Sequence, residues 1–308
     1  MPASPFNATA STDQAPAQDA PDWFTAALSA PVEIGEVAVA GVPISYRGWG
    51  ERGTAGVLLV HGGAAHARWW DHIAPLLASA HRVVAIDLSG HGDSGRREVY
   101  SLDLWADELM AVTADGGIAG APIVVGHSMG GFVTLRAATR FGDALAGAIT
   151  VDSPIRALTP EEEAAARRNA FGPLRIYPSR DEILKRFRPI PDQDALPYVR
   201  RHVAENSVRA VAGGWSWKFD PQIFGRARLA PSVLTRLECR VALFRAEHGL
   251  VSADMGEMIY QRLGRVAPVI EIPGAGHAIM LDQPLALLTG IRTLLADWQH
   301  SLPPNGQD

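Results

Sequence analysis

Residues 126–130 of the chain, GHSMG, place a serine between glycines in a pattern that is typical of a nucleophilic serine. An apolar stretch, residues 121–125, precedes the pattern, and a helical stretch, residues 131–140, follows it. A turn that lifts the Ser128 hydroxyl above a sheet requires unusual backbone angles, and neighbouring glycines relieve the crowding. The helix would direct its free N-terminal N–H groups at an oxyanion formed during acyl transfer. The pattern predicts acyl transfer on Ser128, and an ordinary turn serine is the alternative interpretation.

Two other stretches end in residues that could complete this chemistry. Residues 56–60 are apolar and lead into a glycine-rich turn, HGG. The N–H of Gly63 in that turn could hold an oxyanion together with the N–H of Met129. Residues 268–272 form another strand pattern, and the loop after it ends in His277. These stretches predict an oxyanion hole at Gly63 and Met129 and a general base at His277.

With these motifs the chain resembles an α/β-hydrolase of the esterase and lipase kind, from about residue 23 to residue 298. The resemblance rests on HGG at 61–63, DLSGHGDSG at 87–95, GHSMGG at 126–131 and GAGH at 274–277. It implies a triad in the chain order serine, acid, histidine, with Ser128 and His277 as two of its members. The resemblance says much less about the substrate than about the fold.

The acid of the implied triad is displaced from its usual strand. In most members of the family the strand after the cap ends in a segment like G-E-x-D, and its aspartate orients the histidine. Here residues 241–245 are followed by AEHG, so Gly249 stands where the aspartate is expected. His277 still needs a partner on its second ring nitrogen, which fixes the tautomer and stabilises the imidazolium.

Two carboxylates could provide that partner, and a third is a weaker candidate. Asp152 ends the strand pattern of residues 146–151, where some relatives of this fold carry their acid, and Pro154 turns the chain sharply there. Glu247 could reach from the usual strand, but a loop-bracing role suits it better than catalysis. Asp254 is the third candidate. We favour Asp152, for which an ordinary turn or capping aspartate is the alternative.

The alternation of strand and helix patterns predicts an α/β fold with a mostly parallel sheet flanked by helices. The alternation runs from residue 32 to residue 150, stops, and resumes at residue 240. We therefore expect a core at 23–153 and 235–308 and a helical cap at 154–234, called the cap segment below. Residues 37–40 and 43–46 predict an edge hairpin. Thr159 with Glu162, and Ser179 with Glu182, mark two helix starts in the cap segment, and the second helix would carry an apolar stripe of Ile183, Leu184 and Phe187.

Aromatic residues near the predicted site have two interpretations. Trp215, Trp217 and Phe219 alternate in the cap segment and would share one side if that stretch is extended. Trp69 follows the predicted oxyanion turn. The rings either pin the cap segment to the core or line a pocket for an apolar, uncharged substrate.

Composition is typical of an enzyme in a reducing cytoplasm. The 308 residues are 47% hydrophobic and carry a net charge of −5 without long charged blocks, which argues against nucleic acid or an anionic membrane as a partner. Cys239 is the only cysteine, so no intramolecular disulfide can form. No apolar stretch is long enough to span a bilayer, and residues 1–22 are expected to be a disordered tail rather than a signal peptide.

The sequence thus predicts a serine hydrolase that cleaves an ester, lactone or thioester of a small, mainly apolar substrate through an acyl-enzyme on Ser128. A carbon–carbon bond hydrolase or a cofactor-free perhydrolase with the same triad is the alternative. A non-catalytic small-molecule receptor is a third hypothesis, motivated by the glycine at 249. The serine hydrolase mechanism requires no cofactor. No metal is expected either, because the spacing of four histidines near strand ends matches no ligand pattern: His61, His66, His91 and His127. The sequence leaves the oligomeric state open.

Overall fold

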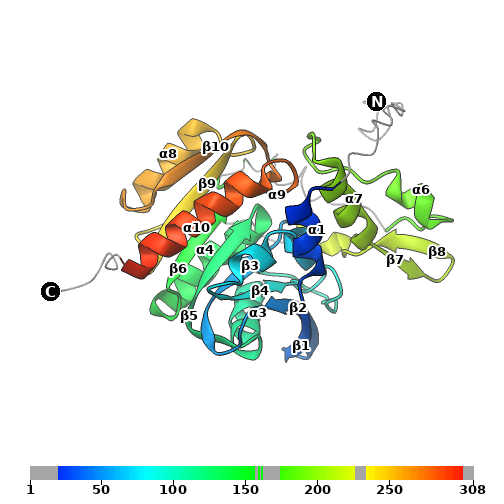
Figure 1. Ribbon diagram of the computed structural model, residues 1–308, viewed down its shortest axis with the longest axis horizontal. Helices are drawn as coiled ribbons and strands as arrows, with labels where there is room; N and C mark the ends of the chain where they lie inside the picture. The colour runs from blue at the N-terminus through cyan, green and yellow to red at the C-terminus, as the bar shows by residue number, and fades with distance from the viewer. Residues whose placement is uncertain (1–19, 157–158, 160, 162–173, 226–233, 301–308) are drawn as a thin grey trace.

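The computed structural model describes residues 20–156, 159, 161, 174–225 and 234–300. Eight strands form the central sheet in the order β1-β2-β4-β3-β5-β6-β9-β10 (Figure 1). From β4 to β10 all neighbours are parallel, and β1 and β2 form an antiparallel edge, so the expected mostly parallel α/β sheet is confirmed. The strands are β1 (Glu33–Val39), β2 (Val42–Trp49), β3 (Thr54–Val60), β4 (Arg82–Ile86), β5 (Ile118–His127), β6 (Gly147–Val151), β9 (Arg240–His248) and β10 (Val269–Gly276).

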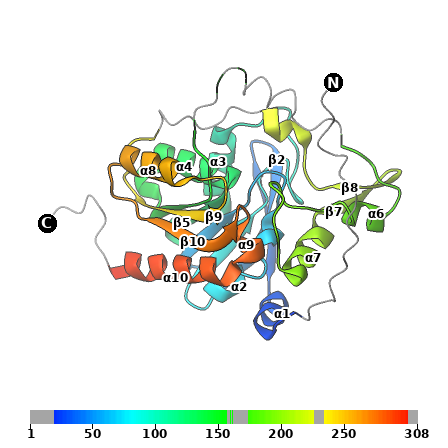
Figure 2. The same ribbon diagram turned by 90° about the horizontal axis from the view of Figure 1, so that it is seen from above.

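Helices cover both faces of this sheet, as the view from above shows (Figure 2). One face carries α3 (Leu102–Asp115), α4 (Met129–Phe141) and α8 (Ala253–Arg262). The other carries α1 (Asp22–Ser29), α2 (Ala74–Leu77), α9 (Ile279–Asp282) and α10 (Pro284–His300). Successive side chains of a strand point to opposite faces. In β3, Leu58 and Val60 therefore join the core under α3 and α4, whereas Val57 and Leu59 join the core under α10.

The edge hairpin is confirmed, with its turn one residue earlier than expected. Val39 of β1 pairs with Val42 of β2, so Ala40 and Gly41 are the two turn residues. Both have a positive φ, 47° and 76°, which matches a two-residue turn whose twist follows that of the strands.

The cap segment is not purely helical, which corrects the expectation. Its described parts contain α6 (Arg180–Leu184), α7 (Pro197–Asn206), the antiparallel pair β7 (Val208–Val211) and β8 (Gly214–Trp217), and a 3-10 turn, η3 (Pro221–Gly225). Val211 pairs with Gly214, so Ala212 and Gly213 form the turn, and Gly213 has a positive φ of 85° that glycine adopts readily.

The helix starts expected in the cap segment have different outcomes. The Ser179 hydroxyl accepts a hydrogen bond of 3.2 Å from the N–H of Glu182, so the second capping box is confirmed. Ile183 and Phe187 are buried as expected, and Leu184 is half-buried. The first capping box, Thr159 with Glu162, lies outside the described residues.

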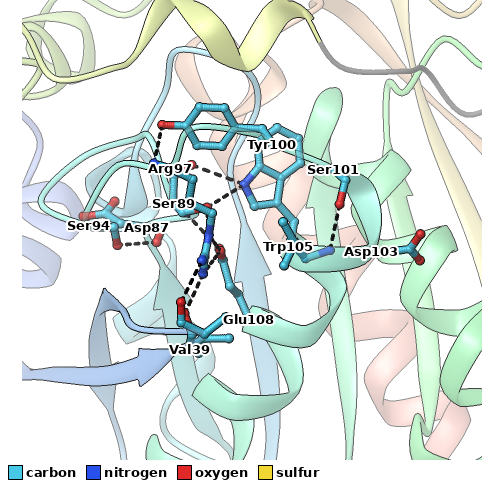
Figure 3. Close-up of polar contacts among 12 residues, drawn as sticks. Val39, Asp87, Ser89, Ser94, Arg97, Tyr100, Ser101, Asp103, Trp105 and Glu108 are labelled. Atoms are coloured by element: carbon cyan, nitrogen blue, oxygen red, sulfur yellow. Dashed lines mark hydrogen bonds and ion pairs between the residues drawn. The ribbon is translucent and has the colours of Figure 1, made fainter.

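A buried ion pair braces the loop between β4 and α3 (Figure 3). Arg97 lies 2.9 Å from Glu108, whose side chain is fully buried in the middle of α3. The second oxygen of Glu108 accepts the N–H of Ser89 at 2.8 Å, and Arg97 also donates to the carbonyl of Val39 in β1. One helix, one loop and the edge hairpin are thereby tied together.

Most of the expected tail, residues 1–22, lies outside the described residues, and α1 begins at Asp22 with Phe24 buried against the core. No helix in the described ranges is both long enough and apolar enough to cross a membrane. The expected cytoplasmic location stays a prediction.

Candidate active site

Ser128 occupies a sharp turn between β5 and α4. Its φ of 51° and ψ of −115° lie in a region that non-glycine residues rarely adopt. The turn needs glycine beside it, because a Cβ built on Gly126 would lie 2.3 Å from the carbonyl oxygen of Gly130. The backbone thus presents a half-exposed serine at the carboxyl end of β5, as the sequence pattern predicted.

His277 lies within hydrogen-bond distance of two other predicted site residues, Ser128 and Asp152. His277 Nε2 is 3.0 Å from the Ser128 hydroxyl oxygen, and His277 Nδ1 is 2.7 Å from Asp152 Oδ2. The three side chains come from the ends of β5, β6 and β10, which meet at the same edge of the sheet. With Nδ1–H donated to Asp152, the lone pair of Nε2 faces the Ser128 hydroxyl and can accept its proton.

Asp152 is held as a buried, ionised acceptor. Its carboxylate accepts backbone N–H groups from Leu250 at 2.7 Å, Ala246 at 3.2 Å and Val251 at 3.3 Å, besides the histidine. Burial acts to raise the pKa of Asp152, but the hydrogen bonds from His277 and these N–H groups outweigh it, and the pKa lies below its ordinary value. Its φ of 43° lies in the left-handed region, and its carboxylate contacts His277 directly after the end of β6.

The glycine at the usual acid position makes room for Asp152. A Cβ built on Gly249 would lie 2.4 to 2.6 Å from the carboxylate atoms of Asp152. Such an approach is far inside van der Waals contact, so any side chain at 249 would displace the carboxylate. The glycine at 249 is therefore required for the Asp152 carboxylate to occupy its position beside His277.

The other two acid candidates do not contact His277. Glu247 is exposed and accepts the N–H of Gly274 at 2.7 Å, which braces the irregular end of β10, just before His277. Asp254 is exposed in the first turn of α8. The loop-bracing interpretation of Glu247 fits this placement, and its role as an alternative acid does not.

The predicted oxyanion residues lie next to each other beside the serine. Met129 is the first residue of α4, so its N–H has no carbonyl one turn earlier to bind. A Cβ built on Gly63 would lie 3.7 Å from Met129 Sδ, and one built on Gly62 would lie 3.3 Å from the Ser128 Cβ. The glycine-rich turn therefore packs on the serine turn, where two N–H groups could hold an oxyanion.

Several buried histidines surround the site as neutral groups. Burial lowers the pKa of His61 to about 4 and, with the nearby His277, that of His127 to about 3. His127 Nε2 lies 2.9 Å from the carbonyl oxygen of His277, so the neutral ring donates to the backbone of the catalytic candidate. No three metal-ligating side chains in the described parts of the chain come together in a way that could hold a metal ion.

The four aromatic candidates lie mostly between the cap segment and the core. The ring of Trp69 in the core approaches that of Phe187 in the cap segment, with centroids 6.4 Å apart. Trp217 approaches Phe187 inside the cap segment, at 6.3 Å, and also packs against both core clusters. Trp215 packs in a small cluster inside the cap segment, and Phe219 is buried in the main core. These contacts favour the pinning interpretation.

One aromatic residue beside the site was not predicted. A Cβ built on Gly63 would lie 3.2 Å from the ring of Phe224 in η3, so this ring lies over the glycine-rich turn. No motif marks Phe224 in the sequence, because its position depends on how the cap segment returns to the core.

Comparisons with known proteins agree with this geometry. A model of the alpha/beta hydrolase family matches residues 57–289. The esterase Rv0045c of Mycobacterium tuberculosis is 30% identical over 248 residues, covering 78% of this chain and 82% of that protein. Lipase LipV of the same organism is 26% identical over 80% of this chain and 95% of its own length.

Solved structures show the same architecture. The structure of the M. tuberculosis esterase Rv0045c matches with a TM-score of 0.70 and 24% identity, covering 86% of this chain and 92% of that one. E-2-(acetamidomethylene)succinate hydrolase matches with a TM-score of 0.74 and 20% identity, covering 86% and 100%. At these identities the likeness establishes the fold alone.

Proposed function

The chain belongs to the alpha/beta hydrolase family and is a hydrolase of carboxylic esters, and we propose that it acts through a serine nucleophile, Ser128. The observation that carries the proposal is the unbroken series of contacts from Asp152 through His277 to the Ser128 hydroxyl. This series has the polarity that acyl transfer needs, with an ionised acid, a base and a nucleophile in line.

In the proposed mechanism His277 Nε2 takes the Ser128 proton as Oγ attacks the ester carbonyl carbon. Asp152 stabilises the imidazolium that forms, and the N–H groups of Gly63 and Met129 hold the oxyanion. The imidazolium then gives its proton to the leaving alcohol. Water, activated in turn by His277, attacks the acyl-enzyme and releases the acid and free Ser128.

We propose a small, mainly apolar ester as the substrate. Phe224 lies over the oxyanion turn, and Met129 belongs to an apolar cluster with Phe219 and Ile223 of the cap segment. Lactones and thioesters offer the same kind of acyl carbon. No contact among the described residues favours the carbon–carbon bond hydrolase or the perhydrolase over an esterase.

The structure gives no support to the hypothesis of a non-catalytic receptor. It depends on the absence of an acid for His277, and Asp152 lies 2.7 Å from the ring nitrogen that needs one.

Hydrolysis of p-nitrophenyl acetate and p-nitrophenyl decanoate tests the proposal. We expect turnover by the wild type and by Ser252→Ala, a helix-capping serine exposed on α8, and a loss of roughly 10⁴-fold or more in Ser128→Ala. Mass spectrometry of acid-quenched wild type should show an acyl group on Ser128. Folded wild type without turnover of either ester, or Ser128→Ala with wild-type turnover, would contradict the proposal.

A further inference from the structure

One side chain of the cap segment, Gln193, contacts the loop that carries His277. Gln193 lies between α6 and α7 and is half-buried. Its amide oxygen accepts the N–H of Ala278 at 2.7 Å, and its amide nitrogen donates to Asp282 Oδ2 at 2.8 Å. A weaker contact of 3.3 Å runs from the same nitrogen to the carbonyl of Ala278. The cap segment therefore holds the residue directly after the proposed base.

The peptide bond that follows His277 is held at both of its ends. Its carbonyl oxygen accepts from His127 Nε2 at 2.9 Å, and its N–H, that of Ala278, donates to Gln193. His127 directly precedes Ser128, so one end of the peptide is tied to the serine turn and the other to the cap segment. A peptide plane fixed at two ends leaves the attached imidazole little freedom to tilt.

Asp282 keeps the Gln193 amide in the orientation that this contact needs. Its Oδ2 atom accepts the N–H of Gly276 at 2.6 Å as well as the amide nitrogen of Gln193. A carboxylate can only accept while ionised, so the NH₂ end of the amide faces Asp282 and the oxygen end faces Ala278. The N–H groups on both sides of His277 are thereby bound, one to Asp282 and one to Gln193.

The chain leaves space for this amide and adds a second backbone tie beside it. A Cβ built on Gly276 would lie 2.8 to 3.0 Å from the amide atoms of Gln193. The N–H of Leu196 donates to the carbonyl of Leu281 at 2.9 Å. Residues 193–196 of the cap segment thus lie along α9. The Gln193 amide packs directly on the backbone of Gly276, the residue before His277, which has no side chain to block it.

Resting on the proposed function, we propose that Gln193 is a positioning residue for His277, which aligns Nε2 with the Ser128 hydroxyl while the cap segment is docked. Gln193 does not touch the reacting atoms. It acts through the peptide bond after His277, whose orientation sets the distance between base and nucleophile. A displacement of about 1 Å in such a pair can lower the rate by about 10²-fold.

Gln193→Met tests the proposal, because methionine keeps the length of the side chain and lacks both polar amide atoms. We expect kcat for p-nitrophenyl acetate to fall by roughly 10- to 100-fold with KM changed less than about twofold. The rate at which a fluorophosphonate reagent labels Ser128 should fall by a similar factor, since labelling needs the activated serine but no ester. Gln193→Ala should behave in the same way.

His202→Ala is the matched control. His202 Nε2 lies 3.0 Å from Asp71 Oδ2, so the variant also removes a polar contact between the cap segment and the core, but away from the His277 loop. We expect its kcat to stay within about threefold of wild type. An equal fall in His202→Ala and Gln193→Met would show general loosening of the cap segment and overturn the proposal.

Gly276→Ala approaches the same contact from the other side. Its new methyl group would displace the Gln193 amide, so kcat should fall in the wild-type background and fall no further when added to Gln193→Met. Wild-type kcat and labelling rate in Gln193→Met would overturn the positioning role and leave the proposed function intact. A wild type that neither turns over esters nor becomes labelled on Ser128 would overturn both.

Discussion

Two buried carboxylates in this protein have the same kind of partner and different surroundings. Asp152 and Glu108 are both fully buried, and each contacts the side chain of one basic residue, His277 at 2.7 Å and Arg97 at 2.9 Å. Asp152 sits at a strand end with φ 43°, whereas Glu108 sits inside α3. The pKa of Asp152 lies below its ordinary value, whereas burial raises the pKa of Glu108 in spite of hydrogen bonds from Ser89 and Arg97.

The two pairs differ in the further contacts that His277 and Arg97 make. The second nitrogen of His277 faces the half-exposed hydroxyl of Ser128, a group that can react. The other donors of Arg97 go to Ser89 and to the backbone of Val39, which are structural contacts (Figure 3). A buried ion pair is therefore not by itself a sign of catalysis. Two features distinguish the candidate site from the Arg97–Glu108 pair, called the brace below. These are the unusual backbone angles of Ser128 and the solvent access of its hydroxyl.

The largest effect is expected from moving the acid between strands. Asp152→Gly should lower kcat/KM by roughly 10³- to 10⁴-fold, because His277 loses its partner. Adding Gly249→Asp should restore at least about tenfold of that loss, since the Asp152 carboxylate no longer occupies the space beside position 249. Gly249→Asp alone should lower kcat/KM, because its side chain would collide with the Asp152 carboxylate. Steady-state kinetics on p-nitrophenyl acetate measures all three. Full activity of Gly249→Asp alone would contradict the claim that the two positions cannot both hold a carboxylate.

The brace should respond in stability and not in catalysis. Glu108→Gln leaves the buried Arg97 guanidinium without its counter-charge, so we expect the free energy of unfolding to fall by about 3 to 5 kcal/mol. The kcat of the folded protein should stay within about threefold of wild type. Asp103→Asn is the matched control on the same helix, since Asp103 is exposed and pairs with Arg136, and its effect should be below about 1 kcal/mol. Urea unfolding gives both values, and equal values for the two variants would break the comparison.

Acid should destabilise the fold through buried histidines that stay neutral. Burial lowers the pKa of His61 and His72 to about 4, lowers that of His127 to about 3, and lowers that of His66 well below its ordinary value. Below pH 6.5 the unfolded chain binds protons on these histidines that the folded chain does not, so stability falls as the pH falls.

Three buried carboxyls offset part of that loss, because burial raises the pKa of Glu108 as well as those of Asp87 and Asp282. Burial raises the pKa of Asp87 and Asp282 to about 6, so the folded chain binds their protons first and gains stability as the pH falls through 6. With four histidines against three carboxyls, we expect a net loss of at least about 2 kcal/mol from pH 7 to pH 5. Urea unfolding at both pH values measures it, and His72→Gln should flatten the dependence. Equal stability at pH 5 and pH 7 would contradict the claim that these histidines stay neutral in the folded protein.

The smallest effect concerns the substrate. Phe224→Ala should open space over the oxyanion turn and shift the ratio of kcat/KM for decanoate over acetate esters upwards by about tenfold, or 1 to 2 kcal/mol. Trp215→Ala is the control, because Trp215 packs inside the cap segment, and its ratio should not change. A larger shift in Trp215→Ala would mean that the pocket lies at the tryptophan instead.

The sequence predicted the parts of the molecule whose position follows from strand ends. Ser128, Asp152 and His277 each end a recognisable strand pattern, and parallel strands bring their carboxyl ends to one edge of the sheet. The sequence shows a glycine at 249 where an aspartate is expected, but its close approach to Asp152 depends on how β9 pairs with β6. Whether the three residues act in catalysis is still a proposal.

The cap segment was predicted less well. The hairpin of β7 and β8 was missed because the pairing partner of the aromatic stretch carries no motif of its own. Phe224 and Gln193 depend on contacts with residues far away in the chain, at Gly63 and Ala278, and on how a segment without motifs folds back over the core. Local sequence patterns do not encode such contacts.

The central claim is that Asp152, one strand earlier than usual, is the acid that serves His277. The most direct test is kcat/KM for p-nitrophenyl acetate in Asp152→Asn and in Glu247→Gln, with the folding of both variants checked by circular dichroism. This account predicts a loss of roughly 10³- to 10⁴-fold in Asp152→Asn and wild-type activity in Glu247→Gln. Wild-type activity in folded Asp152→Asn, or a comparable loss in Glu247→Gln, would contradict it.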